Sequence, residues 1–231
     1  MLATLLHRLV DHLPSQCRVC HSWPAHAICD DCVSLFAQPL PRCQTCALPL
    51  PAGMVHCGAC LKNPPPLDRC LAAVAYAYPW SGLVAEFKFR DQTGLARSFA
   101  ALMRAAPWVE PALDAADMVV PMPLSRNKLA QRGYNQAHLL ARELSAAKTR
   151  TDLLLRIQDT PAQHTLKRAQ RLSALDHAFA IEPLLAGRVR GAHVVLVDDV
   201  MTTGATLHAA SRVLRASGAS HITGLVLART A

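Results

Sequence analysis

The sequence lacks a long uninterrupted run of apolar residues, although 52% of its 231 residues are hydrophobic. A membrane-spanning helix needs about 20 consecutive apolar residues, so we expect no membrane span. Charged and histidine side chains interrupt Met1–Leu13, and no small-residue cleavage site follows, which argues against a secretory signal. The leucine spacing there predicts an amphipathic helix instead. We therefore expect a cytoplasmic protein.

Acidic residues are scarce beside basic ones, with 16 Asp and Glu against 24 Lys and Arg and a formal net charge of +8. The excess is uneven, because residues 126–171 hold ten Lys or Arg and three acids. A block of this kind either binds an anionic partner, such as single-stranded DNA, or forms a solvated face. The composition leaves both alternatives open.

Eight of the nine cysteines form four Cys-x-x-Cys pairs. These are Cys17/Cys20, Cys29/Cys32, Cys43/Cys46 and Cys57/Cys60. Two such pairs supply the four thiolates of a closed tetrahedral zinc site, so two structural zinc ions are predicted. Successive pairs could share a metal, or the pairs could be interleaved; we favour the successive arrangement. Disulfides are the alternative, which a reducing compartment disfavours.

The cysteine-rich region is expected to stabilise a fold or bind a partner, because closed Cys₄ sites have no open position for catalysis. Zinc loading would leave the eight thiolates with a net charge of about −4, which offsets roughly half of the formal positive charge. The proline cluster Pro64–Pro66 predicts a boundary between a helix and double zinc-ribbon region, 1–66, and a second domain, 67–231. The ninth cysteine, Cys70, is expected to be a buried small hydrophobe.

The carboxyl-terminal third contains an apolar run followed by two acids. His193–Val197 is rich in β-branched residues without alternation, which predicts a parallel strand buried on both faces. Asp198 and Asp199 follow at its carboxyl end. Carboxylates at that position can accept hydrogen bonds from sugar hydroxyls or hold a cation.

A threonine-rich turn comes directly after the acids and leads into a predicted helix, Leu207–Ser217. Its residues are Thr202, Thr203, Gly204, Ala205 and Thr206. Helix N-termini offer unpaired N–H groups to anions, and a glycine lets the backbone approach closely. The lysine spacing of a P-loop is missing. The turn therefore predicts a phosphate site of another type.

Further elements are predicted from periodicity. Strands are expected over 70–78, 117–120, 152–157 and 222–227, and helices over 80–90, 94–105 and 137–147. The strand over 117–120 ends at the corner Pro121, Met122 and Pro123, where exposed N–H groups could bind a pyrophosphate. Three cations, Arg126, Lys128 and Arg132, lie in the expected loop that follows. Lys88 is a further candidate, with a solvated helix face as the alternative.

The segment Val194–Thr206 resembles the phosphoribosyl pyrophosphate (PRPP) motif of type I phosphoribosyltransferases. Together with the cysteine pairs, Arg-Gly-Tyr-Asn-Gln-Ala at 132–137 and Thr-x-x-Gln-x-x-Leu at 160–166, it makes the whole chain resemble the ComF family, in particular its ComF/GntX branch. The resemblance implies an α/β fold, with a type I phosphoribosyltransferase-like parallel sheet flanked by helices and a small N-terminal double zinc ribbon. It also implies PRPP and Mg²⁺ as ligands and a link to competence and DNA uptake.

By this resemblance Asp198 and Asp199 would bind the ribose hydroxyls, and residues 202–206 would hold the 5′-phosphate. The cations after the proline corner would stabilise the diphosphate. Gln163 and Arg171 match the family pattern, whereas Ala174 replaces a family asparagine. No general base is apparent, so the acceptor cannot be named. A phosphoribosyltransferase, a non-catalytic PRPP sensor and a nucleic-acid adaptor remain the alternatives.

Overall fold

The computed structural model describes residues 15–157 and 178–231. The helix predicted over Met1–Leu13 and the candidates Gln163, Arg171 and Ala174 lie outside the described residues. The chain divides into two compact units, Met1–Gln38 and Pro39–Ala231. In the described part of the smaller unit, Ser15 pairs with Ala25 and one helix follows, α2 (Asp30–Phe36).

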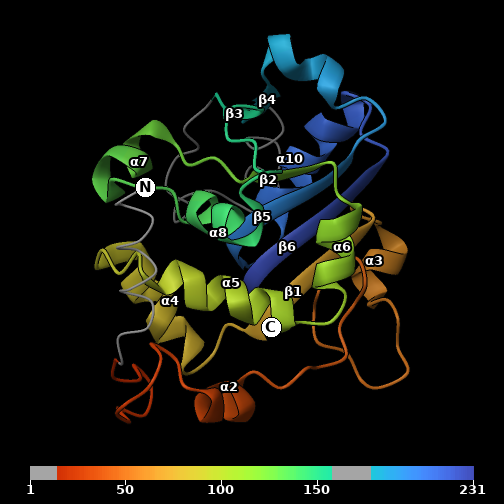
Figure 1. Ribbon diagram of the computed structural model, residues 1–231. Helices are drawn as coiled ribbons and strands as arrows, with labels where there is room; N and C mark the ends of the chain where they lie inside the picture. The colour runs from red at the N-terminus through yellow and green to blue at the C-terminus, as the bar shows by residue number, and fades with distance from the viewer. Residues whose placement is uncertain (1–14, 158–177) are drawn as a thin grey trace. The chain divides into compact units, whose positions relative to one another are not determined.

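A parallel sheet of four strands forms the centre of the larger unit, in the order β1-β6-β5-β2 (Figure 1). Its strands are β1 (Arg69–Ala75), β2 (Met118–Pro121), β5 (His193–Met201) and β6 (His221–Arg229). In β5, Val194 and Leu196 join one core cluster, while Val195 is equally buried outside that cluster. The strand is thus covered on both faces, as its unbroken apolar run predicted.

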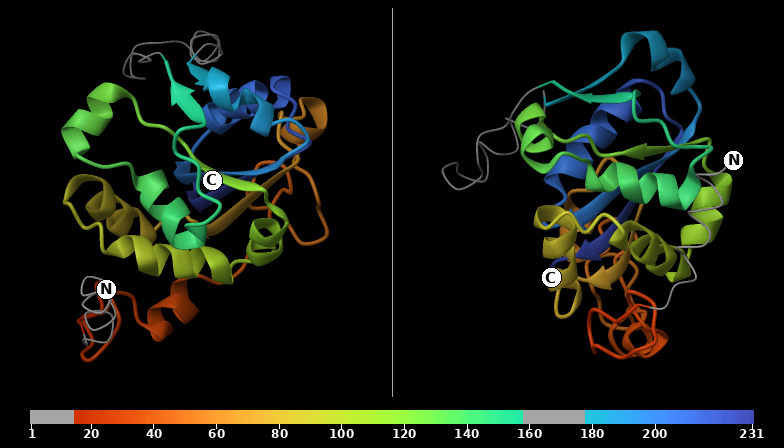
Figure 2. Two further views of the ribbon diagram at one scale, coloured as in Figure 1. Left: turned by 45° about the horizontal axis from the view of Figure 1, so that its top comes forward. Right: turned by 60° about the vertical axis from the view of Figure 1, so that its left-hand side comes forward.

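Helices flank this sheet, which confirms the predicted fold class. They are α4 (Trp80–Phe89), α5 (Leu95–Ala105), α6 (Val109–Ala115), α7 (Arg126–Arg132), α8 (Gln136–Ser145) and α10 (Ala205–Ala216), with a 3₁₀ helix, η1 (Pro183–Arg188). Figures 1 and 2 show α5 and α8 side by side against the sheet, and both contact its strands. Leu207 and Leu214 of α10 instead pack into the cluster that holds Val194.

Two elements differ from the sequence-based expectations. The strand expected over 152–157 is β3 (Leu154–Arg156), which pairs antiparallel with β4 (Phe179–Ile181) in a separate small sheet. The basic segment expected to be a loop is helix α7. Ser125 Oγ accepts a hydrogen bond from Lys128 N at 3.4 Å, and Gly133 ends the helix with a φ of +75°. Both are ordinary helix caps.

Strand β5 continues to Met201, four residues past its predicted end at Val197. The reason is that β6 runs alongside it as far as the pair Met201 and Arg229. On its other side β2 stops earlier, where Pro121 pairs with Val197. The acidic pair therefore lies in a strand that has lost one neighbour, so its side chains border the open end of the sheet.

Along the chain, the boundary between the compact units falls between Gln38 and Pro39, whereas the sequence predicted it after Pro66. The difference arises because the second group of cysteines packs into the core of the larger unit. Cys43, Cys46 and Cys57 belong to the same buried cluster as Cys70. A short helix, α3 (Gly58–Lys62), follows Cys57.

Among the described residues, no helix combines the length and the apolar character needed to cross a bilayer. This agrees with the absence of a long apolar run in the sequence.

Candidate functional site

A cavity of about 150 Å³ opens beyond the end of β2, beside the last residues of β5. It brings the acidic pair, several cations, part of the proline corner and one loop threonine together from distant parts of the chain. The lining residues are Lys88, Met122, Pro123, Leu124, Lys128, Arg132, Asn135, Gln136, Ala137, Arg156, Asp198, Asp199 and Thr206. Carboxyl ends of parallel strands are the usual place for ligands in such folds.

In the acidic pair, Asp199 is buried, Asp198 is half-buried, and the charge is partly neutralised. Lys88 Nζ lies 2.8 Å from Asp199 Oδ1, and these two side chains are only 19% and 10% exposed. Asp199 N donates a hydrogen bond to Asp198 Oδ1 at 2.9 Å. Burial, together with the charge of Asp199, raises the pKa of Asp198 to about 7. Near neutral pH the pair therefore carries less than its full negative charge, and one lysine balances most of it.

Three further cations face the same cavity. Lys128 and Arg132 come from α7, and Arg156 comes from β3. Burial lowers the pKa of Lys128, and the charges of Arg156 and Arg132 lower it further. The Arg132 guanidinium lies 4.9 Å from the centre of the Phe89 ring. Repulsion among these cations favours a multiply charged anion between them.

The segment 132–136 connects the walls of the cavity. Tyr134 Oη donates a hydrogen bond to the Phe87 carbonyl at 2.6 Å, next to Lys88 at the end of α4. Asn135 Nδ2 donates to the carbonyl of Met122 at 3.0 Å and so ties down the proline corner. The Arg-Gly-Tyr-Asn-Gln sequence therefore links the end of α4, which carries Lys88, to the proline corner through these two hydrogen bonds.

Gln136 supplies an unused donor to this cavity. Its side-chain oxygen accepts a hydrogen bond from Arg132 Nη1 at 3.0 Å. Its Nε2 is buried and, in the described part of the chain, has no hydrogen-bond partner. A buried amide without a partner is costly, so an acceptor oxygen from a ligand would stabilise it.

The threonine-rich turn has the backbone that an anion site needs. Gly204 adopts a φ of +80°, and a Cβ there would lie 2.4 Å from Met201 Cε. The positive φ favours glycine, and a side chain at this position would also displace the end of Met201. Ala205 N approaches Thr203 Oγ1 at 3.4 Å, and α10 begins at Ala205. The N-terminus of a helix of 12 residues thus faces the ligand side of the turn.

Several predicted ligands lie near this cavity without lining it. Arg126 is exposed at the first position of α7, and Pro121 is buried at the end of β2. In the turn, Thr206 lines the cavity, while residues 202–205 lie beside it. Sequence reasoning did not select Asn135, Gln136 or Arg156. The first two stand in a motif it had noticed, whereas Arg156 reaches the site from the separate small sheet.

The eight paired cysteines form two groups of four. Within each group, all four sulfur atoms lie within 4.8 Å of one another. The first group is Cys17, Cys20, Cys29 and Cys32, and the second is Cys43, Cys46, Cys57 and Cys60. The successive pairing is therefore confirmed, and the interleaved one is wrong.

The sulfur positions suit a tetrahedral zinc ion. The Cys17 and Cys32 sulfurs are 3.8 Å apart, and those of Cys46 and Cys57 are 3.7 Å apart. Sulfur atoms about 2.3 Å from a central zinc have similar separations. The Cys57 N–H also points at the Cys43 sulfur at 3.3 Å, which favours a thiolate there. The donor sets thus fit two zinc ions in closed sites.

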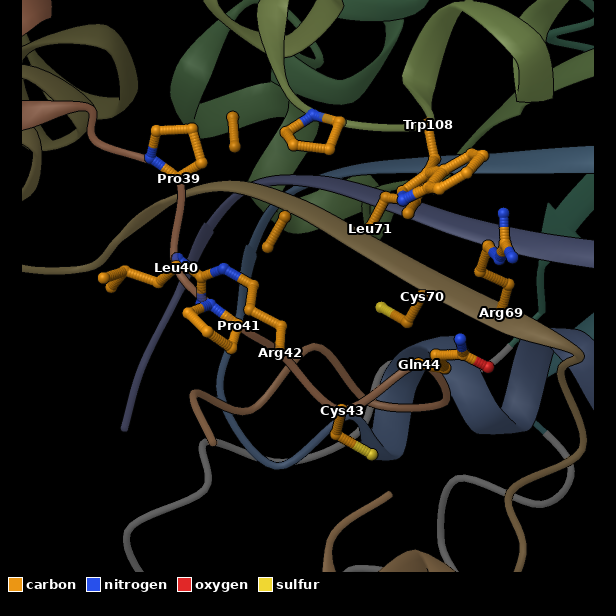
Figure 3. Close-up of a pocket in the computed structure, with 13 residues that line it drawn as sticks. Pro39, Leu40, Pro41, Arg42, Cys43, Gln44, Arg69, Cys70, Leu71 and Trp108 are labelled. Atoms are coloured by element: carbon orange, nitrogen blue, oxygen red, sulfur yellow. The ribbon is translucent and has the colours of Figure 1, made fainter. Parts of the chain in front are cut away.

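A second cavity, of about 230 Å³, lies beside β1 in the larger unit (Figure 3). Prolines, Leu40, Leu71 and Trp108 line most of it, together with Arg42 and Arg69. None of its lining residues in the described chain is a carboxylate, and neither the acidic pair nor the threonine turn reaches it. The sugar-phosphate chemistry expected from the sequence therefore belongs to the smaller cavity.

Comparison with known proteins agrees with this arrangement. Residues 129–231 match the family model described as the phosphoribosyl transferase domain. The chain is 31% identical over 220 residues to "DNA utilization protein YhgH" of Salmonella typhimurium, covering 93% of this chain and 95% of that protein. It is 32% identical over 212 residues to "Competence protein F" of Haemophilus influenzae, covering 88% and 91%.

"Competence protein ComFC" of Bacillus subtilis is 35% identical over 114 residues, or 49% of this chain and 45% of that protein. The identity to the Salmonella and Haemophilus proteins extends over nearly the full length of both partners. The chain therefore belongs to the ComF family of proteins with a phosphoribosyl transferase domain.

Proposed function

We propose that the larger unit binds PRPP, together with Mg²⁺, in the cavity beside β5. One observation supports this most strongly: an acidic pair, with Asp199 buried and Asp198 half-buried, lines a single small cavity together with Lys88, Lys128 and two arginines. A PRPP site needs both acidic and basic side chains. The acids accept hydrogen bonds from the ribose hydroxyls, and the basic side chains bind the diphosphate, which is a strong anion. A simple phosphate site would not need two carboxylates.

Each part of PRPP has a matching set of residues. The ribose hydroxyls would donate hydrogen bonds to Asp198 and Asp199. The 5′-phosphate would lie on the turn 202–206, at the N-terminus of α10. The diphosphate would take the cations of α7, with Arg156 and the buried amide of Gln136 as further donors. Lys88, which pairs with Asp199 and lines the same cavity, would be a further partner of the diphosphate.

Mg²⁺ fits the donor set of this cavity. It prefers oxygen ligands and usually keeps several waters beside a carboxylate and a phosphate. Asp198 and Asp199 are the carboxylates that line the cavity, so they are the protein groups suited to hold it. With the diphosphate, the bound ion would supply positive charge to the leaving group.

The matching reaction is transfer of a phosphoribosyl group with release of pyrophosphate. The ribose C1 becomes electron-poor as the diphosphate departs, so stabilising the departing charge is the main catalytic task. Lys128 and Arg132, which α7 brings to the cavity, are the proposed catalytic cations, together with Arg126, which is exposed at the start of the same helix. In the described part of the chain, no histidine lines the cavity. An acceptor would therefore have to be reactive without a histidine base.

That observation also favours a second candidate, a PRPP sensor that binds without turnover. Release of pyrophosphate separates the two. If PRPP binds and a broad panel of nucleobases, amines and oligonucleotides releases no pyrophosphate, the protein is a sensor. If any acceptor drives stoichiometric release, it is a transferase.

Calorimetry tests the binding site itself. Titration of PRPP with Mg²⁺ into Asp198→Ala/Asp199→Ala should show at least about a hundredfold weaker binding than wild type, because two hydrogen-bond acceptors of the ribose are lost. Asp114→Ala/Asp152→Ala is the matched control, since both acids are exposed and neither lines the cavity. Zinc content should be equal in all three proteins. Unchanged affinity in the first variant would disprove the site assignment.

The names of the relatives point to a physiological setting, DNA utilisation in one case and competence in the other. We propose that this chain links PRPP to the uptake or use of external DNA. A strain without the protein should take up labelled DNA poorly, and the wild-type gene should restore uptake better than Asp198→Ala/Asp199→Ala.

Direct contact with DNA is a separate proposal, for which exposed Arg126 and Lys128 on α7 are suited. Affinity for single-stranded DNA should then fall steeply with salt concentration. A flat salt response would rule out contacts with backbone phosphates.

A further inference from the structure

Arg229 connects the threonine-rich turn with the second cysteine group. It is the last residue of β6 and is only 7% exposed. Its Nε donates a hydrogen bond to the Cys46 carbonyl at 2.9 Å. Its Nη1 donates to the carbonyls of Met201 and Thr202, at 3.3 and 2.5 Å. One guanidinium thus holds the start of the turn and the loop between two cysteine ligands.

Among the described residues, no carboxylate balances the positive charge of this guanidinium. In the described ranges, neither Arg229 nor nearby Arg42 forms an ion pair with a carboxylate. Arg42 is half-buried and lies close enough to Arg229 for the two charges to repel each other. Arg42 Nη1 donates to the Ala47 carbonyl at 3.1 Å, inside the same cysteine segment. A buried cation without a counter-charge is costly.

The second cysteine group can supply that counter-charge. Four thiolates around Zn²⁺ carry a net charge of about −2. Figure 3 shows Arg42, Cys43 and Gln44 on one stretch of chain near Cys70 of β1. A zinc-loaded group at this place would supply a counter-charge for both arginines.

Apolar contacts run along the same route. The Cys70 sulfur lies 3.5 Å from the Met201 sulfur, and Cys70 N donates to the Gln44 carbonyl at 2.8 Å. The far end of Met201 in turn occupies the space next to Gly204. The base of the turn is therefore connected to the second cysteine segment directly through the hydrogen bonds of Arg229, and indirectly through Met201 and Cys70 of β1.

We propose that Arg229 is a positioning residue, through which the zinc-loaded second cysteine group holds the turn 202–206 in its anion-binding shape. The inference rests on the proposed function, because it makes affinity for PRPP depend on one zinc site. The proposal predicts that loss of metal from the first group, which belongs to the other compact unit, leaves the turn unchanged.

Hydrogen exchange measured by mass spectrometry tests the mechanical part without any ligand. The probe is the peptide that contains residues 202–206. In Cys57→Ser/Cys60→Ser its exchange should be about tenfold faster than in wild type, because charged hydrogen bonds that fix the turn are weakened. In Cys29→Ser/Cys32→Ser, the matched change in the first group, its rate should stay within about twofold. Equal rates in both variants would overturn the proposal.

Arg229→Lys provides a test in which all zinc ligands remain. A lysine keeps the charge but cannot reach three carbonyls at once with the planar fork of arginine. Zinc content should be unchanged, while exchange of the turn and the Kd for PRPP should each rise about tenfold. Arg215→Lys is the control, since Arg215 also binds two carbonyls but at the far end of α10. It should leave both quantities unchanged.

The proposed binding of PRPP and the proposed positioning role of Arg229 can be disproved independently. If wild-type protein does not bind PRPP, the proposed function is wrong, and the exchange rates still decide the role of Arg229. If PRPP binds with equal affinity to wild type and Arg229→Lys, and the turn exchanges equally in both, the positioning role is wrong. Should Cys57→Ser/Cys60→Ser fail to fold, Arg229→Lys alone decides the question.

Discussion

The two cysteine groups share one chemical composition but lie in different surroundings. In the first group Cys20 is exposed and Cys29 half-buried, within a unit of fewer than forty residues. In the second, Cys43, Cys46 and Cys57 are buried in the main core of the larger unit. The same ligand spacing thus produces a small self-contained site in one place and a component of a large core in the other.

This difference teaches that a Cys-x-x-Cys pair specifies the metal geometry but not the role of the metal. The surroundings decide the role. A metal group in a small unit stabilises that unit, whereas a group that is part of a large core contributes to the folding free energy of the whole larger unit.

Loss of ligands from the second group should destabilise the larger unit most. Cys57→Ser/Cys60→Ser should lower its free energy of unfolding by at least about 3 kcal/mol, because a buried metal site is lost. Cys29→Ser/Cys32→Ser should change the same transition by less than about 0.5 kcal/mol. Differential scanning calorimetry resolves the two cases. Similar losses in both variants would contradict the contrast.

The turn that packs on the second group should not tolerate a side chain. Gly204→Ala combines a left-handed backbone with a Cβ 2.4 Å from Met201 Cε. We expect it to cost about 2 to 4 kcal/mol in urea denaturation. Gly133→Ala is the control, with a φ of +75° but open space around the Cβ, and should cost about 1 to 2 kcal/mol. Equal costs would mean that Met201 does not support the turn.

The buried acid beside this turn should make stability depend on pH. The pKa of Asp198 is about 7 in the folded protein, against 3.8 for the ordinary side chain. The folded state therefore holds a proton that the unfolded state releases, so this group's contribution to stability falls as pH rises from about 4 to about 7. Asp198→Asn should remove that fall, by more than about 1 kcal/mol over the interval.

Asp68 provides the opposite sign as a control. Burial acts to raise its pKa, but the Ile222 N–H and Arg215 lower it overall. Its contribution to stability is thus present above the ordinary pKa and is lost as pH falls through the lowered one. In chemical denaturation at a series of pH values, Asp68→Asn should destabilise the protein at pH 7, and the difference should vanish in acid. A shared sign for the two variants would refute the assignment of the Asp198 pKa.

The smallest effect is expected at the ninth cysteine. Cys70 is buried beside the second group but is not one of its four ligands. Cys70→Ala should cost about 1 kcal/mol for the lost sulfur contact and leave the zinc content unchanged. Metal analysis together with denaturation measures both. Loss of one zinc per chain would make Cys70 part of the metal site.

Much of the larger unit could be predicted from the sequence. The unbroken apolar run of β5, the acids after it and the glycine turn are local signals, and each was placed within a few residues. Helix α7 was missed although its caps, Ser125 and Gly133, are visible in the sequence. The segment between these caps was predicted to be a loop because a basic run is also typical of a solvated loop.

The long-range contacts could not be predicted. Arg229 and Cys46 are 183 residues apart, and a polar residue at a strand end gives no indication of its partner. Arg156 reaches the cavity from a separate sheet for the same reason. Periodicity reports which residues are buried and not what they are buried against. The predicted domain boundary therefore separated the second cysteine group from the core that contains it.

The central claim is that the cavity beside β5 holds PRPP, and a crystal structure with PRPP and Mg²⁺ tests it most directly. We predict that the ribose hydroxyls lie against Asp198 and Asp199, with the 5′-phosphate on the turn 202–206. Lys88 should have left Asp199 for the diphosphate. PRPP bound only in the cavity beside Trp108, or a Lys88–Asp199 pair that remains intact with PRPP bound elsewhere, would contradict the account.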